Sequence, residues 1–399
     1  MWDFDVIIVG AGPGGSNAAT VALRSGLKVA QIEAARFPRV KPCAGGLTIK
    51  AVRALQADVV PPRSSFSALE FNVWGRRRNR FCHGSTVLHT VCRPQFDNDL
   101  VHRNLSQPNF TFLDDHRVAA IEYDGCFKVC TSRGVLRGAQ LIGADGAYSL
   151  VNRTFGIASP RATATALEIN VEEGETRQAV PCLDYGAIPF GYGWVFPKAN
   201  HVSVGLYTLA PRSKHIRDAL RSYARSKELI VDSRGRLEAF RLPVGGYIAR
   251  VPPCPVYIVG DAGGFADGLT GEGIYYALES GRLAGETAVD VAAGNANHRA
   301  YYRRLWPTVL CDTTATFFAA RAFYRNVECG FRILESPLVW RPLIHGAATG
   351  ATFAASILKC ALLLQQSLKH HATREQRTWN ADASVASDCA IGCALSGSA

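Results

Sequence analysis

Two glycine-rich clusters about 250 residues apart constrain the fold of this 399-residue chain. The first cluster, Gly10-x-Gly12-x-x-Gly15, follows an apolar segment at 4–9 and precedes a segment with helical periodicity. A strand, a glycine turn and a helix in this order are typical of a dinucleotide-binding βαβ unit. Gly10 allows the tight turn, Gly12 lets the backbone approach a pyrophosphate, and Gly15 lets the helix pack on the strand. The sequence therefore predicts a Rossmann-type α/β unit at its start.

The residues around this turn complete the predicted nucleotide site. Pro13 and Gly14 begin the predicted helix, whose first N–H groups have no partner within the helix and attract an anion. Glu33 ends the next predicted strand, at 28–33, and lies 23 residues after Gly10. An acidic side chain at this place binds ribose hydroxyls in dinucleotide-binding proteins.

The second cluster, at 260–273, distinguishes a flavin cofactor from a nicotinamide cofactor. Gly260 and Asp261 follow an apolar strand predicted at 256–259, and Gly271-Glu272-Gly273 precedes a predicted helix at 273–293. We expect Asp261 to hydrogen-bond ribityl hydroxyls and the helix to direct its positive end at the flavin ring. A nicotinamide needs only the first cluster, whereas a flavin dinucleotide that lies extended across a protein needs both. FAD is therefore the predicted cofactor.

Composition argues against several other classes of protein. The net charge is +11, but no zinc-knuckle spacing and no basic repeat with interleaved aromatic residues accompanies it, so we do not expect nucleic acid binding. The twelve cysteines are scattered without a CxxC pair, which favours reduced thiols in the cytoplasm and no metal site. No run of 18 uncharged apolar residues occurs, since the nearest candidate, 346–364, contains Lys359. We therefore expect no membrane-spanning helix.

The expected architecture is α/β, α+β overall. A Rossmann-type FAD-binding domain carries an inserted, mostly antiparallel β-sheet substrate domain and is followed by a C-terminal helical region. In the substrate domain, strands at 66–74 and 80–91 are expected to pair around an arginine-rich turn. The predicted boundaries are 1–65, 92–163 and 251–299 for the FAD-binding domain, 66–91 and 164–250 for the substrate domain, 300–369 for the helical region and 370–399 for a loosely ordered tail.

A stripe of aromatic residues marks the substrate domain. Tyr192, Trp194 and Phe196 alternate along one predicted strand, so all three side chains share one face of the sheet. Pro189 and Pro197 bracket the strand, which is typical of an edge strand or of one that ends sharply. The stripe forms either part of a sheet core or the wall of an apolar slot. A slot of this kind suits an isoprenoid chain, which has methyl branches and no polar groups.

This strand also carries a resemblance to a known family. Residues 189–197 are similar, at every fixed position, to the P-x-x-Y-x-W-x-F-P signature of the geranylgeranyl reductase family. Residues 41–46 resemble that family's K-x-C-G-G-G segment, with Ala44 in place of a glycine. The resemblance covers roughly residues 4–300 and implies the fold of group A flavoproteins, like that of para-hydroxybenzoate hydroxylase.

The resemblance also implies further cofactor contacts. Residues 93–100 are similar to the R-x-x-F-D-x-x-L helix start of such flavoproteins, in which the arginine, here Arg93, contacts the cofactor. Residues 143–146 resemble their Asp-Gly element, which would place Asp145 and Gly146 near the pyrophosphate. The remaining contacts implied by the resemblance are Ala34, Val118 and Ile274.

The activity that the resemblance implies is reduction of isolated C=C bonds in a geranylgeranyl or other polyprenyl chain. Hydride from reduced flavin N5 requires protonation of the other alkene carbon, and NADPH or ferredoxin would supply the electrons. Cys43 and Glu272 are the candidate proton donors, although Cys43 also suits a small buried residue and Glu272 a helix cap. The alternative is an oxygen-using monooxygenase or a halogenase, because both share this architecture.

The C-terminal region adds an expectation about location. Aromatic residues are interspersed with arginines between Phe317 and Arg341. This pattern suits either contact with anionic headgroups or helices packed on the rest of the protein. The first interpretation predicts a cytoplasmic protein that associates peripherally with a membrane and acts on a polyprenyl lipid.

Overall fold

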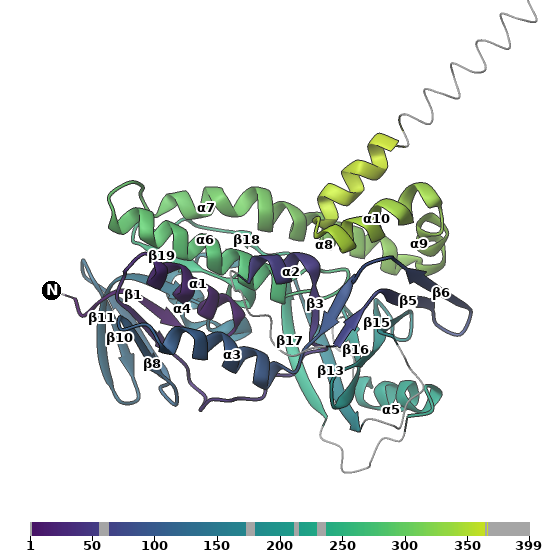
Figure 1. Cartoon of the computed structure of the whole chain (residues 1–399), viewed down its shortest axis with the longest axis horizontal. Helices are drawn as coiled ribbons and strands as arrows, with labels where there is room; N and C mark the ends of the chain where they lie inside the picture. The colour runs from purple at the N-terminus through teal and green to yellow at the C-terminus, as the bar shows by residue number, and fades with distance from the viewer. Residues whose placement is uncertain are drawn as a thin grey trace, which may run out of the picture.

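Two seven-stranded sheets and a set of long helices form the molecule (Figure 1). The computed structural model describes residues 2–55, 64–172, 180–210, 215–229, 237–363 and 365, and only the backbone of 77–80. The predicted α/β class, with a Rossmann-type sheet, an antiparallel substrate sheet and C-terminal helices, is confirmed. The domain boundaries stay a prediction, and the predicted tail lies outside the described residues.

The first sheet holds the dinucleotide-binding unit. Five strands run parallel in the order β8 (Phe110–Leu113), β2 (Val29–Ile32), β1 (Phe4–Val9), β11 (Gly134–Gly143) and β19 (Val256–Ile258). The longer β11 also carries the antiparallel strands β10 (Phe127–Thr131) and β9 (Val118–Tyr123). The side chains of β1 and β19 are almost entirely buried, as expected for parallel strands covered by helices on both faces.

Two helices from opposite ends of the sequence cross over this sheet. They are α1 (Pro13–Arg24) and α6 (Ile274–Ala292). A Cβ atom on Gly281 would lie 2.2 Å from the carbonyl oxygen of Gly14, and one on Gly14 would lie 2.8 Å from that of Ala277. The two backbones are therefore in direct contact, and only glycine allows this approach. As a consequence, both helix N-termini reach the same edge of the sheet.

The second sheet builds the substrate side. Its strand order is β17 (Glu238–Val244), β13 (Ala162–Glu172), β16 (His201–Thr208), β15 (Gly191–Pro197), β14 (Cys182–Tyr185), β5 (Ala68–Val73) and β6 (Arg77–Cys82). All neighbours are antiparallel except β14 and β5. Helix α5 (Ile216–Ser226) packs on one face, where Tyr223 fills the space above Gly193.

Two details of this sheet differ from the sequence expectations. The strand predicted at 80–91 is two strands, because a turn at His83-Gly84-Ser85 interrupts it. Strand β7 (Leu88–Thr90) instead pairs with β3 (Gly46–Thr48) and β4 (Ser64–Phe66) in a small separate sheet. The strand with the aromatic stripe, β15, is internal, with β14 and β16 on its two sides, so an edge strand was the wrong alternative. Pro197 ends the strand.

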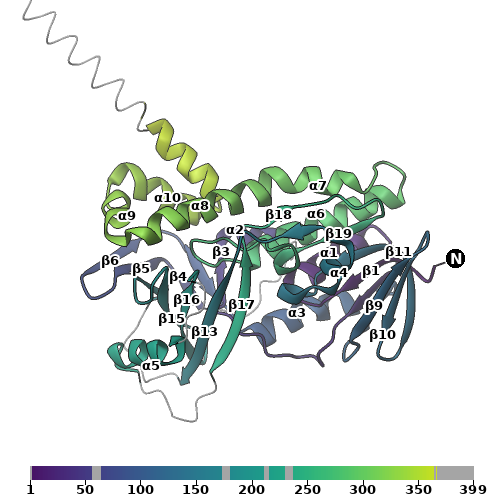
Figure 2. The same ribbon diagram turned by 180° about the vertical axis from the view of Figure 1, so that it is seen from behind.

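The C-terminal helices form a layer along one side of both sheets (Figures 1 and 2). After α6 come α7 (Arg299–Leu305), a π-helical turn at Trp306–Leu310, α8 (Cys311–Arg325), α9 (Val327–Leu334), α10 (Pro337–Thr349) and a last helix at 353–363. Phe317, Tyr324 and Phe331 are buried against the substrate sheet. These three aromatic side chains of the C-terminal region therefore pack inside the protein instead of facing headgroups.

Two kinds of feature are absent from the described residues. None of the helices there combines the length and the apolar character needed to cross a bilayer. Within the same residues, no three His, Cys, Asp or Glu side chains are grouped so that they could hold a metal ion.

The contact between α1 and α6 predicts the effect of one substitution. In Gly281→Ala the added methyl would overlap the Gly14 carbonyl, so the helices must separate, at a cost of about 1–3 kcal/mol. We expect a lower melting temperature and weaker FAD retention. The matched control is Gly84→Ala, since nothing lies within 4 Å of a Cβ there. Equal melting temperatures for the two variants would contradict this account of the crossing.

Candidate active site

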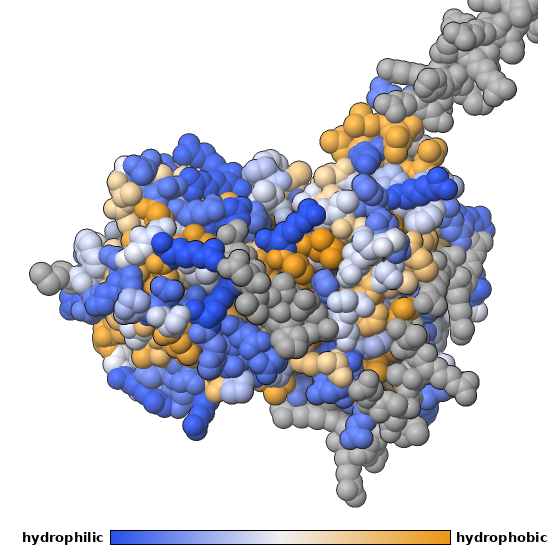
Figure 3. Space-filling view, viewed as in Figure 1, coloured by the Kyte–Doolittle hydropathy of each residue, from blue (hydrophilic) through white to orange (hydrophobic). Residues whose placement is uncertain are grey.

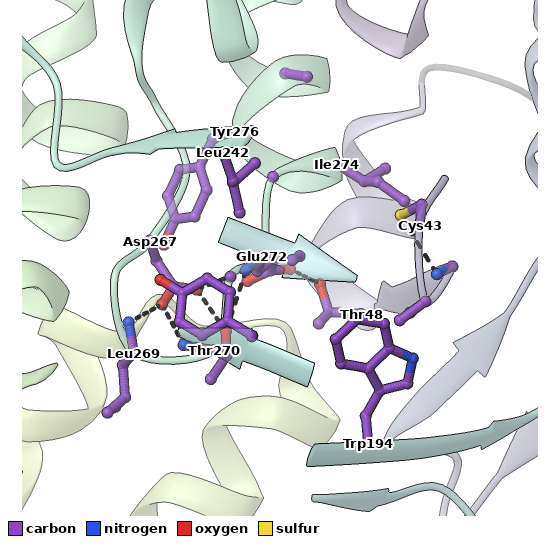
Figure 4. A pocket seen from close by; sticks show the side chains of 18 of the residues that line it. Cys43, Thr48, Trp194, Leu242, Asp267, Leu269, Thr270, Glu272, Ile274 and Tyr276 are labelled. Atoms are coloured by element: carbon purple, nitrogen blue, oxygen red, sulfur yellow. Dashed lines mark hydrogen bonds between the residues drawn. The ribbon is translucent and has the colours of Figure 1, made fainter. Parts of the chain in front are cut away.

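A cavity of about 360 Å³ lies between the two sheets (Figure 4). Its first wall comes from the glycine clusters and includes Gly12, Gly14, Gly260 and Gly271. The opposite wall comes from β15 and β16. The residues that the sequence assigned to a cofactor and those assigned to a substrate thus meet in one space.

The glycine wall fits an extended FAD. Gly12 caps α1 and Gly273 caps α6, and neither helix has a side-chain cap, so both N-termini present backbone N–H groups. Helix N-termini of this kind attract a pyrophosphate and stabilise negative charge on a reduced flavin ring. Gly10, Gly260 and Gly271 have positive φ angles, which lets the backbone turn without a Cβ atom in the way.

Several predicted cofactor residues line the cavity. Besides the glycines already named, the wall includes Pro13, Arg93, Gly146, Asp261, Gly273 and Ile274. Asp261 forms an ion pair with Lys41, with 3.3 Å between Oδ2 and Nζ. Lys41 begins the segment at 41–46, so this pair joins that loop to the ring-side cluster.

Other predicted residues lie outside the cavity wall. Gly10 and Gly15 pack on each other, because a Cβ on Gly15 would lie 2.2 Å from the Gly10 carbonyl. Glu33 accepts a hydrogen bond from the backbone N–H of Ala11 at 3.1 Å, beside the glycine turn. Ala34 follows Glu33, and the N–H of His116 donates to the Glu33 carbonyl, which brings the start of β9 and Val118 to the same region. These positions suit the nucleoside end of an extended cofactor.

The side chains of Asp145 and Arg93 have protein partners. The Asp145 carboxylate accepts hydrogen bonds from Ser149 Oγ and from the N–H groups of Leu150 and Val151, so it caps helix α4 (Leu150–Phe155). Its neighbours Ala144 and Gly146 line the cavity, whereas Asp145 is not among the lining residues. Arg93, at the start of α3 (Arg93–Leu105), is buried and not a surface residue.

Arg93 lies between a carboxylate and the thiol of Cys43. Its guanidinium donates to both oxygens of Asp97, at 2.9 and 2.8 Å. Burial alone would lower the pKa of Arg93, but Asp97 and, to a smaller extent, Cys43 raise it above its usual value. The guanidinium therefore stays charged beside Cys43.

The backbone of Cys43 is held from the substrate sheet. Its N–H donates to Glu168 Oε1, and its carbonyl accepts from Lys198 Nζ, both at 3.0 Å. Burial raises the pKa of Glu168, and the nearby Lys198 ammonium opposes this rise. The N–H of Gly45 donates to the Cys43 sulfur at 3.3 Å. Glu168 and Lys198 were not predicted; the only signal was that Lys198 directly follows Pro197.

Glu272, the second candidate donor, is fully engaged. Its Oε1 accepts from Thr48 Oγ1 at 2.5 Å, and its Oε2 lies 2.9 Å from Lys50 Nζ (Figure 4). Lys50 also lies 3.7 Å from Asp312 and over the rings of Tyr275 and Tyr276. Burial lowers the pKa of Lys50, but the Glu272 and Asp312 carboxylates outweigh it and raise that pKa above its usual value. Both oxygens of Glu272 thus accept from other groups.

The aromatic wall lines the cavity and also supports the ring-side loop at 267–272. Tyr192, Trp194 and Phe196 all line the cavity, as expected for alternate residues of one strand. The Tyr192 hydroxyl also donates to the Thr270 carbonyl. Tyr207, on β16, donates to the Gly268 carbonyl at 3.0 Å, and Tyr324, on α8, donates to that of Leu269 at 2.5 Å. Three consecutive carbonyls of the loop are each bound by a tyrosine.

Asp267 binds the N–H groups of the same loop. Its carboxylate accepts from the N–H groups of Leu269 and Thr270 at 2.7 Å and of Glu272 at 3.1 Å, and from the Thr270 hydroxyl. Burial raises the pKa of Asp267 to about 6, with a further rise from Glu272, while the hydrogen bonds of Thr270 oppose it. Asp267 was not predicted, although the Asp267-Gly268 pair with Thr270 two residues later is a turn signal.

Comparisons with known proteins show that the chain carries a FAD-binding domain. Residues 3–220 match the family model of the FAD binding domain. An uncharacterized protein of Methanosarcina barkeri is 32% identical, over 91% of this chain and 95% of the relative. The menaquinone reductase of Mycolicibacterium smegmatis is 32% identical, over 89% and 91%. The digeranylgeranylglycerophospholipid reductase 1 of Methanopyrus kandleri is 29% identical, over 78% and 88%.

This chain belongs to the geranylgeranyl reductase family of FAD-dependent enzymes. Among solved structures, a geranylgeranyl bacteriochlorophyll reductase-like protein from Thermoplasma acidophilum has a TM-score of 0.73 at 19% identity, covering 90% of this chain and 95% of that one. A flavin-dependent brominase has a TM-score of 0.74 at 16% identity, over 93% and 99%. The fold is therefore shared by reductases and halogenases and does not itself select the reaction.

In this member of the geranylgeranyl reductase family, we expect the Asp267 carboxylate to control the ring-side loop. In Asp267→Asn an amide N–H₂ faces groups that are all donors, so at least one buried donor loses its partner, at a cost of about 1–3 kcal/mol. The expected results are a lower melting temperature and a larger dissociation constant for FAD, measured by flavin fluorescence. Asp218→Asn, at an exposed position on α5, should match the wild type in both.

Proposed function

We propose that this FAD-dependent enzyme saturates isolated C=C bonds in the isoprenoid chain of a lipid. The observation that supports this most is the cavity itself, in which the flavin-side glycines face Tyr192, Trp194 and Phe196. Away from the glycines, the wall is mostly apolar and includes Leu69, Phe71, Leu88, Leu183, Leu343 and Phe353. Relatives are named for menaquinone, for a digeranylgeranylglycerophospholipid and for geranylgeranyl diphosphate, and all three of these molecules carry such chains.

The residues of the cavity contribute binding and electrostatics. Reduced FAD, when bound, supplies the hydride. Apolar burial of an isoprenoid contributes roughly 25 cal/mol per Å². The faces of Tyr192 and Trp194 stabilise positive charge that develops on a trisubstituted alkene carbon during protonation. These aromatic side chains therefore both bind the chain and favour the transition state.

We assign the proton donor to Cys43 in preference to Glu272. The Cys43 backbone is fixed from two sides by Glu168 and Lys198, and the residue lines the cavity. After it gives its proton to the alkene, the thiolate would lie beside the Arg93 guanidinium, which stabilises negative charge. Glu272 has both oxygens bound by Thr48 and Lys50, so we assign it a role in holding the loop.

We also propose an electron donor and a location for this enzyme. NADPH or ferredoxin would reduce the flavin, and the protein would associate peripherally with a membrane that holds the lipid. The competing function is that of an oxygen-using monooxygenase or halogenase, because a flavin-dependent brominase has a similar fold. Oxygen dependence separates these two chemistries.

The decisive experiment uses the FAD-loaded protein, chemically reduced without oxygen, with menaquinone or a geranylgeranylated glycerophospholipid. We expect mass spectrometry to show a gain of two hydrogens for each bond that is reduced. Hydroxylated or halogenated product in air, with no saturated product under anaerobic conditions, would instead establish the competing function.

The proton-donor assignment predicts the effect of Cys43→Ser. A hydroxyl is a much weaker acid than a thiol, so saturation should slow by roughly 100-fold, within the usual range for loss of a general acid. FAD binding and the rate of flavin reduction should stay unchanged. Cys92→Ser is the matched control, because Cys92 lies one residue before Arg93 and is not among the cavity residues. An unchanged rate in Cys43→Ser would rule out this donor.

A further inference from the structure

The last described helix, at 353–363, is apolar on both of its faces. Its inner face carries Phe353 and Ser356, which line the cavity, and Cys360, whose thiol donates to the Val339 carbonyl of α10. Its outer face, defined here as Ile357, Leu358 and Leu362, is exposed to 41%, 62% and 51%. A surface helix of a water-soluble protein normally carries charged residues on this side.

The outer face forms a local apolar patch. Figure 3 shows hydrophobic residues gathered on this helix, at the upper right of the molecule. The described part of this helix, 353–363, has 11 residues, and no described helix has the length and apolar character needed to cross a bilayer. An apolar face with exposed leucines suits a position in the interface plane, with this face below the headgroups.

The C-terminal segment that carries the patch is mainly basic. Between α8 and residue 363 the described charges are the exposed Arg321, Arg325, Arg332, Arg341 and Lys359, against the exposed Glu335, the half-buried Glu328 and the buried Asp312. A mainly positive segment that carries an apolar face is complementary to a bilayer with anionic headgroups. The same charges would weaken docking of a second copy of this chain, because they would face one another.

The cavity under this helix admits a tail more readily than a charged head. The basic residues that line it, within the described part of the chain, are Lys41, Lys50 and Arg93. Each is paired with a carboxylate, of Asp261, Glu272 and Asp97 in turn. A phosphate inside would compete with these ion pairs, two of which are buried, whereas a lipid that stays anchored keeps its head in the bilayer.

We propose that the outer face of helix 353–363 docks on an anionic lipid bilayer, and that the isoprenoid tail of a lipid passes from the bilayer into the cavity beneath this helix. The same short element would thus contact the membrane with one side and the substrate with the other. Docking does not depend on the proposed reductase activity, whereas entry of the tail does.

Docking is tested by flotation of the full-length, FAD-loaded protein with vesicles of phosphatidylcholine and phosphatidylglycerol. We expect the wild type to float with the vesicles, less so at high salt, and the double variant Leu358→Asp with Leu362→Asp to bind at least about tenfold more weakly. Val135→Asp is the matched control, because Val135 is 57% exposed on β11 in the other sheet. Circular dichroism and flavin content establish that each variant is folded.

Two outcomes would overturn docking. One is equal flotation of the wild type and the double variant. The other is a wild type that does not float but elutes as a dimer, with a monomeric double variant, since a second copy would then cover the face.

Entry of the tail is tested with the same variants and the lipid substrate presented in two ways. The double variant should lose most of the reduction of substrate embedded in vesicles and keep its rate on substrate dispersed in detergent. Equal loss with both presentations would refute entry from the bilayer. Vesicle binding by a wild type that reduces neither preparation would mean that the reductase proposal fails and docking stands.

Discussion

The contact of two glycine backbones, where α1 crosses α6, is the constraint on which the rest of the site depends. Gly14 and Gly281 touch without side chains between them, so two helix N-termini from opposite ends of the sequence open toward one cavity. One N-terminus would attract the pyrophosphate of FAD and the other would stabilise its reduced ring. A larger residue at either position would separate these two electrostatic sites, and an extended dinucleotide needs both of them at a fixed spacing.

The ring-side loop at 267–272 is the second consequence of this arrangement. It follows β19 and the glycine turn at 260–264, and it is held by the second sheet and by α8, through Tyr192, Tyr207 and Tyr324 on its carbonyls and Asp267 on its N–H groups. Because most polar backbone groups of the loop have a partner, its conformation is fixed. A fixed loop would keep the flavin and the aromatic wall at a constant separation, which the proposed hydride transfer requires.

Features carried by contiguous residues were predictable from the sequence, and pairings between distant residues were not. The βαβ unit, the two glycine clusters and the aromatic strand each follow from spacing within at most about 30 residues. The ion pair of Lys50 with Glu272 joins helix α2 (Ile49–Ala54) to the ring-side loop, and no periodicity connects these two segments. The prediction of one strand at 80–91 was wrong because residues with high β-propensity continue across a short turn. Tertiary pairing places β7 in another sheet. The two interpretations of the aromatic stripe, as sheet core and as cavity wall, do not exclude each other, since Tyr192 both holds the loop and lines the cavity.

The flavin wall alone does not decide which molecule is transformed, because a reductase-like protein and a brominase share the fold. The rest of the cavity wall comes from the substrate sheet, for example Trp194, and from the C-terminal helices, for example Leu343 and Phe353. Most charged residues of the described cavity lie on the flavin side, such as Lys41 with Asp261, although Glu70 of β5 also lines it, and the residues of α10 and the last helix that line it are mainly apolar. For the isoprenoid substrate proposed above, this distribution would place the alkene toward the flavin and the head toward the outside. Changes in α10 and helix 353–363 would then alter which lipid is accepted before they alter how the flavin reacts.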